Sequence, residues 1–269
     1  MDISVQVVWS FALALFLTLV LPILLLLFLC LFKKISPLPM ALGLLSFFIS
    51  QILLRIPLLQ FCAGQGWYQA LAQSSPLVLG LGLAFTAGLF EESARLGGAA
   101  LLGPRKPAFP GGPPRPGHRT WKGALSFGLG HAFCELILLA GMTHVNNLLF
   151  CVLLGMGEET LSGLLPAGQL DSLTAQFAAV TPLGIAAGLL ERLSAVLFHL
   201  FATSLVFLAV ARRKWLLFPA AILCHTLFNC VALLGLGLWP TELLLFALAL
   251  ACAALFWRSR RWFPQSTAA

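Results

Sequence analysis

Long, mainly apolar runs constrain this chain more than any other feature of its sequence. A membrane-spanning α-helix needs about 20 such residues, and the first run alone extends from Ile3 to Phe32. Of the 269 residues, 60% are hydrophobic and 9% are charged, whereas a soluble domain carries about 25% charge. The sequence therefore predicts an all-α bundle of transmembrane helices in the cell membrane, with residues 1–269 forming a single integral membrane domain.

The apolar runs divide the chain into about seven spans. Residues 142–180 are ambiguous, because the apolar run Leu148–Met156 is too short to cross a bilayer comfortably. They favour an interfacial or re-entrant segment, and an eighth crossing is the alternative. The predicted helices occupy roughly residues 4–32, 38–62, 75–103, 121–141, 181–211, 215–238 and 241–258.

Basic residues gather in four clusters between these spans, one of them in a Pro/Gly-rich loop at 104–120 that we expect to be flexible. With seven helices, all four clusters fall on one side of the membrane, which the positive-inside rule assigns to the cytoplasm. The N-terminus would then lie outside and the C-terminus inside, and an eighth crossing would disrupt the pattern. The clusters hold 13 of the 16 basic residues: Lys33, Lys34, Arg105, Lys106, Arg115, Arg119, Lys122, Arg212, Arg213, Lys214, Arg258, Arg260 and Arg261.

This distribution also bears on partners. A nucleic-acid-binding protein would carry its basic residues as a patch on a soluble face, so the sequence predicts membrane lipid and no nucleic acid as a partner.

Ionisable residues inside the predicted helices are the strongest indication of function. A charged group at the centre of a membrane helix costs roughly 3 kcal/mol, so such residues normally pair, face the bundle interior and mark functional sites. Arg55, near the end of the second helix, is predicted instead to snorkel or to cap that helix. The others are Glu91, Glu92, Arg95, His131, Glu135, Glu191, Arg192, His199 and His225.

The spacing of these residues gives helices three to six a polar stripe each, and the stripes lie at a common depth. Counted from the basic ends of the helices, the polar groups are about 15–20 Å deep, at ~1.5 Å per residue. The pairs that share a helix face are Glu91 or Glu92 with Arg95, His131 with Glu135, Arg192 with His199, and His225 with Asn229.

A buried layer of carboxylates and imidazoles supports two chemistries. A glutamate can act as general base on a water molecule, or two or three His and Glu side chains can hold a zinc ion that acidifies a bound water. Asn229 can donate hydrogen bonds to a developing oxyanion. The residues alone leave both mechanisms open.

The ordered motifs EESAR, GHAFCE, an ER pair followed by a histidine, and HTLFN extend over residues 91–229. This set resembles the YhfC family of intramembrane metalloproteases and, more distantly, PrsW and the type II CAAX prenyl proteases. In the CAAX enzymes one more residue separates the glutamates from the arginine, and a phenylalanine stands where this chain has Ala195. Both departures favour the YhfC branch over the processing of prenylated substrates.

The resemblance implies a protease of the metallo- or glutamate type, with its catalytic-type core at about 75–238 and a membrane protein or peptide as substrate. Glu91 or Glu92 would activate water and Asn229 would assist. The candidate metal ligands, with zinc as the candidate metal, are His131, Glu135, His199 and His225, and the supporting residues are Arg95, Glu191 and Arg192.

Two other functions fit the same residues. Buried Glu, His and Arg side chains also suit the proton relays of transporters, although the chain shows no inverted repeat of the kind many transporters have. A non-catalytic scaffold that binds membrane segments is the third possibility.

Overall fold

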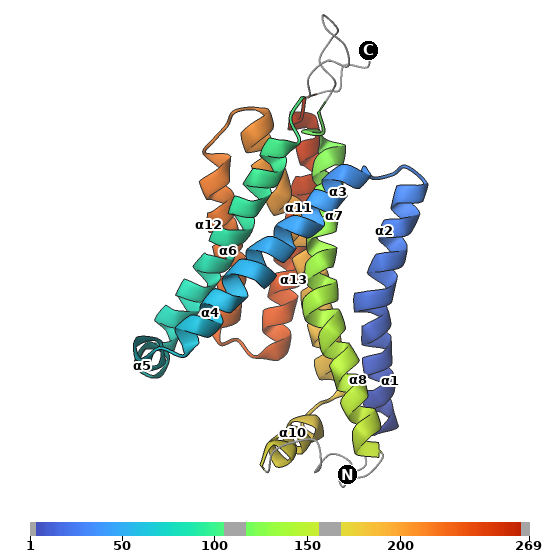
Figure 1. Cartoon of the computed structure of the whole chain (residues 1–269), viewed down its shortest axis with the longest axis vertical. Helices are drawn as coiled ribbons and strands as arrows, with labels where there is room; N and C mark the ends of the chain where they lie inside the picture. The colour runs from blue at the N-terminus through green and yellow to red at the C-terminus, as the bar shows by residue number, and fades with distance from the viewer. Residues whose placement is uncertain (1–3, 105–116, 156–167, 265–269) are drawn as a thin grey trace, which may run out of the picture.

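A computed structural model describes residues 4–104, 117–155 and 168–264, and within them the chain is all helical. Seven helical segments are long and apolar enough to cross a membrane, as predicted (Figure 1). In order they are Val5–Leu31 (α1, η1, α2), Pro37–Ala63 (α3, η2, α4), Pro76–Leu101 (α6), Trp121–Gly155 (α7, η3, α8), Pro182–Ala211 (α11), Leu217–Leu234 (α12, η4) and Leu238–Trp262 (α13, η5).

Three of these segments pass through a wider π-helical stretch without breaking. The stretches are Phe16–Val20 (η1), Phe48–Arg55 (η2) and Leu136–Gly141 (η3). Each flanks or contains residues of the bundle interior, and π-helical turns often occur at functional sites. The short helices α5 (Gly66–Ser74) and α10 (Gln169–Ala178) lie outside the spans, near the same end of the bundle (Figure 1).

The segment after the fourth predicted helix differs from the prediction. Residues 142–155 form α8, which continues α7 and η3 as one helix of 35 residues, so they do not form a separate re-entrant segment. At ~1.5 Å per residue this helix is about 52 Å long, well beyond the ~30 Å hydrocarbon core. A short apolar run can therefore extend the helix that precedes it. The length of the run alone does not predict this. Residues 156–167, and most of the loop at 104–120, lie outside the described residues.

The helix α11 lies at the centre of the bundle. In its most apolar stretch 67% of the residues are buried, against 17–28% in the other spans. It packs against α6, α7, α12 and α13, and its buried face includes Phe198, His199 and Thr203. The helices α6, α7 and α12, which carry the predicted polar stripes, therefore all contact α11.

The helices α3 and α7 cross at very close range through two glycines. A Cβ atom on Gly43 would lie 2.0 Å from the carbonyl oxygen of Phe127, and one on Gly130 would lie 2.1 Å from that of Met40. Only glycine fits at both positions, which brings the backbone of α3 next to the buried ring of His131 on α7.

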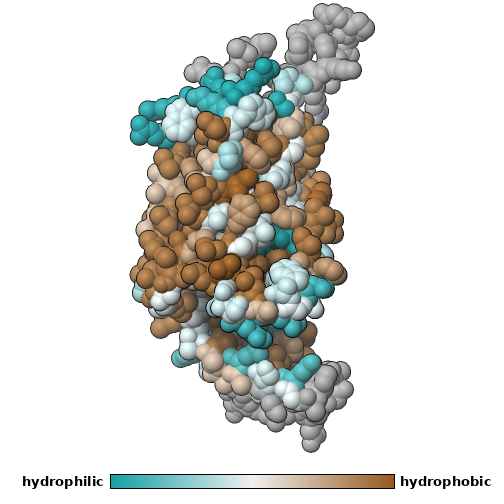
Figure 2. Space-filling model, turned by 90° about the vertical axis from the view of Figure 1, so that its left-hand side faces the viewer, coloured by the Kyte–Doolittle hydropathy of each residue, from teal (hydrophilic) through white to brown (hydrophobic). Residues whose placement is uncertain are grey.

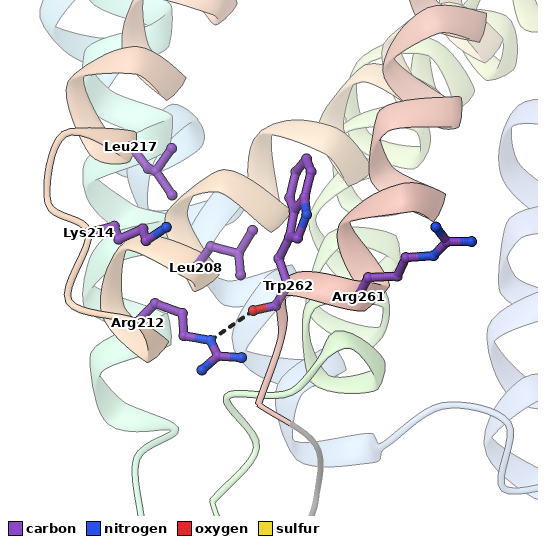
Figure 3. A pocket seen from close by; sticks show the side chains of 6 residues that line it. All are labelled: Leu208, Arg212, Lys214, Leu217, Arg261 and Trp262. Carbon is purple, nitrogen blue, oxygen red and sulfur yellow. Dashed lines mark hydrogen bonds between the residues drawn. The ribbon is translucent and has the colours of Figure 1, made fainter.

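On the face of the bundle that Figure 2 shows, a hydrophobic band lies between two hydrophilic ends. The segments that join α2 to α3 and α11 to α12 lie at one end, together with the end of α6, the start of α7 and η5 (Figure 1), so the described residues of the basic clusters share a side. A cavity of about 530 Å³ opens there (Figure 3), where the Arg212 guanidinium donates to the carbonyl oxygen of Trp262 at 2.8 Å. Which compartment this end faces stays a prediction of the charge rule.

Candidate active site

The site begins with two glutamates and an arginine on α6. Arg95 is fully buried and donates to carboxylate oxygens of both Glu91 and Glu92. The sequence predicted at least one of these ion pairs, and both form. Because an unpaired charge in a membrane interior is costly, this double ion pair makes it possible for α6 to carry two carboxylates into the bundle.

His225 on α12 faces this carboxylate pair. Its Nδ1 lies 2.7 Å from Oε1 of Glu92, and its Nε2 lies 3.9 Å from Oε1 of Glu91. An ionised carboxylate only accepts, so in the neutral form of the ring Nδ1 carries the proton and Nε2 is an acceptor. The second contact is too long for a hydrogen bond. Two lone-pair atoms thus face each other across a buried gap, which a proton donor or a metal ion would fill.

His131 on α7 approaches Glu91 from the other side. Its Nε2 lies 2.9 Å from Oε2 of Glu91, and its Nδ1 lies 2.8 Å from Oγ of Ser46 on α3. The ring is fully buried and packs edge-on against Phe47 at 5.3 Å between centroids. The predicted i,i+4 partner Glu135 does not form one of the contacts recorded for this ring.

Glu135 binds instead to α11. Its Oε2 lies 2.5 Å from Nε2 of His199, and its Oε1 accepts from Arg192 at 3.2 Å. Arg192 also pairs with Glu191. His199 and Arg192, which share one face of α11, are therefore bridged by a single carboxylate from α7, and this chain of contacts ties the two helices together.

A cavity of about 410 Å³ leads to this cluster. Its size is within the range of small-molecule sites. Residues near the start of α6 and in η4 also line it, among them Gly80 and Leu233, so it extends toward the end of the bundle opposite the basic clusters. The predicted site residues that line it are Glu91, Glu135, Glu191, Arg192, His199, His225 and Asn229.

Glu91, His199 and His225 form the group best placed to hold a metal ion. One ligand atom from each lies within 4.8 Å of the others. Two imidazoles and one carboxylate are a ligand set of catalytic zinc sites, in which bonds of about 2.1 Å at tetrahedral angles put ligand atoms about 3.4 Å apart. Oε2 of Glu91 lies 3.9 Å from Nδ1 of His199, and Oε1 of Glu91 lies 3.9 Å from Nε2 of His225. With one ligand atom from each residue the separations are at most 4.8 Å, so the residues would fit a zinc ion after a contraction of up to about 1.4 Å.

One contact competes with a metal for this group. A terminal nitrogen of Arg95 lies 2.7 Å from Nδ1 of His199. Since a guanidinium only donates, this bond occupies the Nδ1 lone pair. Coordination through Nδ1 would require Arg95 to give up that bond, whereas Nε2 of His225 has no such competitor among its recorded contacts.

The sequence did not predict the positions or contacts of several residues in this region. Arg55 does not snorkel as predicted, because its guanidinium donates inward to the Leu83 carbonyl oxygen at 2.7 Å. Gln51 and Arg55 both line the cavity. Glu242, near the start of α13, is 7% exposed. The contact of Ser46 with His131 could not be predicted, because a lone serine in an apolar helix is common.

Comparison with known proteins places these residues in a family. A model of the YhfC intramembrane metalloprotease family matches residues 17–250. A relative from Bacillus subtilis (strain 168), named "Uncharacterized membrane protein YhfC", is 29% identical over 167 residues. That match covers 61% of this chain and 59% of the relative, so the chain spans about three fifths of the relative's length. No solved structure matches the chain.

The family model covers all seven membrane spans in whole or in part, including every residue of the buried cluster. This multi-pass membrane protein therefore belongs to the YhfC intramembrane metalloprotease family.

Proposed function

We propose that this protein is an intramembrane metallopeptidase that hydrolyses a peptide bond of a membrane-protein or peptide substrate in the cavity beside Glu91. The observation that carries the proposal is the pair of acceptor atoms, Oε1 of Glu91 and Nε2 of His225, that face each other at 3.9 Å in a buried site. Neither atom can satisfy the other. A water molecule or a metal ion between them would use both lone pairs.

In this proposal Glu91, His199 and His225 hold the metal, with zinc as the ion that their ligand set favours. A zinc ion bound there would polarise a substrate carbonyl group and acidify water. The remaining residues orient the ligands. Glu92 accepts from Nδ1 of His225, and Oε2 of Glu135 lies 2.5 Å from Nε2 of His199. Carboxylates in such contacts fix the tautomer and the orientation of metal-binding histidines.

The chain's own residues also supply the other parts of a hydrolytic site. Glu135 lines the cavity with a 14% exposed side chain and can take up a proton from water. Asn229, one helical turn beyond His225, lines the same cavity and can donate to an oxyanion that develops on the substrate. With the basic end in the cytoplasm, the cavity would receive substrate from the opposite side of the membrane.

The first test is metal content by mass spectrometry of detergent-purified protein. We expect near one zinc per chain in the wild type and in the control His144→Ala, which removes an imidazole of α8 outside the site. Glu91→Gln and His225→Ala should both lose the metal. Cleavage of a pool of synthetic transmembrane peptides, read by mass spectrometry, should be lost in the same two variants.

Three other results would each contradict part of this proposal. Metal-free wild-type protein that still cleaves peptides would favour a carboxylate mechanism with Glu91 as base. Metal-free protein without cleavage that carries protons into liposomes would favour the transporter function. Zinc retained in Glu91→Gln and His225→Ala would place the metal elsewhere.

A further inference from the structure

Arg55 is the cation of the cavity that lacks a carboxylate partner. It is half-buried within the second span, and none of the ion pairs recorded among the described residues involves it. The cavity's other arginine, Arg192, pairs with Glu135 and Glu191. Arg95, deeper in the site, pairs with both of its glutamates. Both of those arginines therefore have carboxylates in direct contact, whereas Arg55 interacts with the Glu91 carboxylate only from a longer distance.

The contacts of Arg55 hold its guanidinium in place without neutralising it. Nε donates to Oγ1 of Thr86 at 3.3 Å, one terminal nitrogen donates to Oε1 of Gln51 at 3.1 Å, and the other to the carbonyl oxygen of Leu83 at 2.7 Å. All three partners are neutral. A guanidinium has five N–H groups, so two remain for a further acceptor.

Gln51 supplies a second, independent sign of a missing ligand. It lies one turn before Arg55 on the same helix face, lines the cavity, and is 4% exposed. Its Oε1 accepts from Arg55, but its Nε2 is buried and has no hydrogen-bond partner within the described chain. A buried donor left unpaired is destabilising. This corner of the cavity therefore offers only N–H groups and one positive charge, so the complementary ligand accepts hydrogen bonds and is negatively charged.

We propose that Arg55 and Gln51 form a subsite that binds a carboxylate of the substrate, either an acidic side chain or a free C-terminus. This subsite proposal rests on the proposed peptidase function. Arginine is the side chain best suited to a carboxylate, because its planar N–H groups match the two oxygens. Since Arg55 and Glu91 line one cavity, a carboxylate held there would fix the distance along the substrate between the acidic group and the scissile bond.

The test measures binding, so it does not depend on catalysis. Three acetylated apolar peptides of equal length serve as probes: an amide with one central Glu, the same amide with Gln, and the Gln peptide with a free C-terminal carboxylate. We expect the wild-type protein in detergent to bind one or both carboxylate peptides about tenfold or more tightly than the Gln amide. Whichever carboxylate peptide shows the preference identifies the source of the carboxylate.

Variants of the subsite separate this proposal from general charge effects. The preference should disappear in Arg55→Gln and remain in the control Arg212→Gln, which removes a cation at the basic end. Gln51→Glu places a carboxylate next to Arg55 and should also abolish the preference. This variant tests the subsite even if Arg55→Gln misfolds. Equal binding of all three peptides by the wild type, or a preference kept by Gln51→Glu, would overturn the proposal. Absence of peptidase activity together with a clear preference would refute the proposed function alone.

Discussion

Replacing Gly43 by alanine should force α3 and α7 apart and disturb the buried histidine layer. The added Cβ would lie 2.0 Å from the carbonyl oxygen of Phe127 and 3.0 Å from the backbone nitrogen of His131. Both neighbours are backbone atoms, so no side-chain rotation can relieve the contact. Unstrained carbon contacts are about 3.5 Å, and the two helices must therefore separate locally by about 1.5 Å.

The structure sets the size of the effect. Overpacking of this kind costs about 1–3 kcal/mol, and the better helix propensity of alanine returns about 0.5–1 kcal/mol. We expect a net loss of about 1–2 kcal/mol in unfolding free energy. Ser46 is one turn beyond Gly43, and its Oγ lies 2.8 Å from Nδ1 of His131. A separation of about 1.5 Å would lengthen that contact to about 4.3 Å, beyond hydrogen-bonding range.

The matched control is Gly97→Ala on α6. A Cβ at that position has no atom within 4 Å, so the same chemical change should be neutral or stabilising. Denaturation of both variants in mixed micelles, followed by tryptophan fluorescence, gives the comparison. Equal stability of Gly43→Ala and Gly97→Ala would contradict the close crossing of α3 and α7 at Gly43.

Three further predictions follow from the ion pairs and the charge pattern. Glu135→Gln should weaken zinc affinity about 10- to 100-fold in chelator competition, whereas Glu191→Gln should change it little, since Glu191 binds Arg192 and no histidine among its recorded contacts. Arg95→Met should cost about 3–5 kcal/mol of stability, because it leaves buried carboxylates without their counter-ion, and a variant as stable as the wild type in micelle denaturation would contradict this. A fluorescent protein and an alkaline phosphatase fused in turn to the C-terminus should report a cytoplasmic location, and an active phosphatase would reverse the predicted orientation.

Much of the fold was predictable because the bilayer imposes a simple rule on sequence. A span must be helical and apolar over about 20 residues, so six of the seven spans were predicted to within a few residues of the observed ends. The fourth span was predicted to end at 141 because its continuation, Met142–Gly155, contains His144, Asn146 and Asn147. Polar residues mark the end of a membrane-embedded stretch, but a helix can continue past the membrane surface.

The site was predictable in its members but not in its connections. Charges inside membrane helices are rare enough that Glu91, Glu135 and the buried histidines stood out. Helix periodicity relates residues of one helix only. It therefore paired His131 with Glu135, whereas the structure pairs each of them with another helix. Arg55 was misjudged for the same reason, because its partners Leu83 and Thr86 lie on α6.

Each buried histidine lies against a different carboxylate through one nitrogen: His225 against Glu92, His131 against Glu91, and His199 against Glu135. An ionised carboxylate only accepts, so in a neutral ring the proton is on that nitrogen and the other nitrogen is an acceptor. In His199 the other nitrogen lies next to the Arg95 guanidinium, and in His131 it lies next to Oγ of Ser46, which donates to the carbonyl oxygen of Gly43. In His225 it faces another acceptor, the Glu91 carboxylate. The gap between Glu91 and His225 is therefore where the site requires a further proton or cation, and chemistry at this site should begin there.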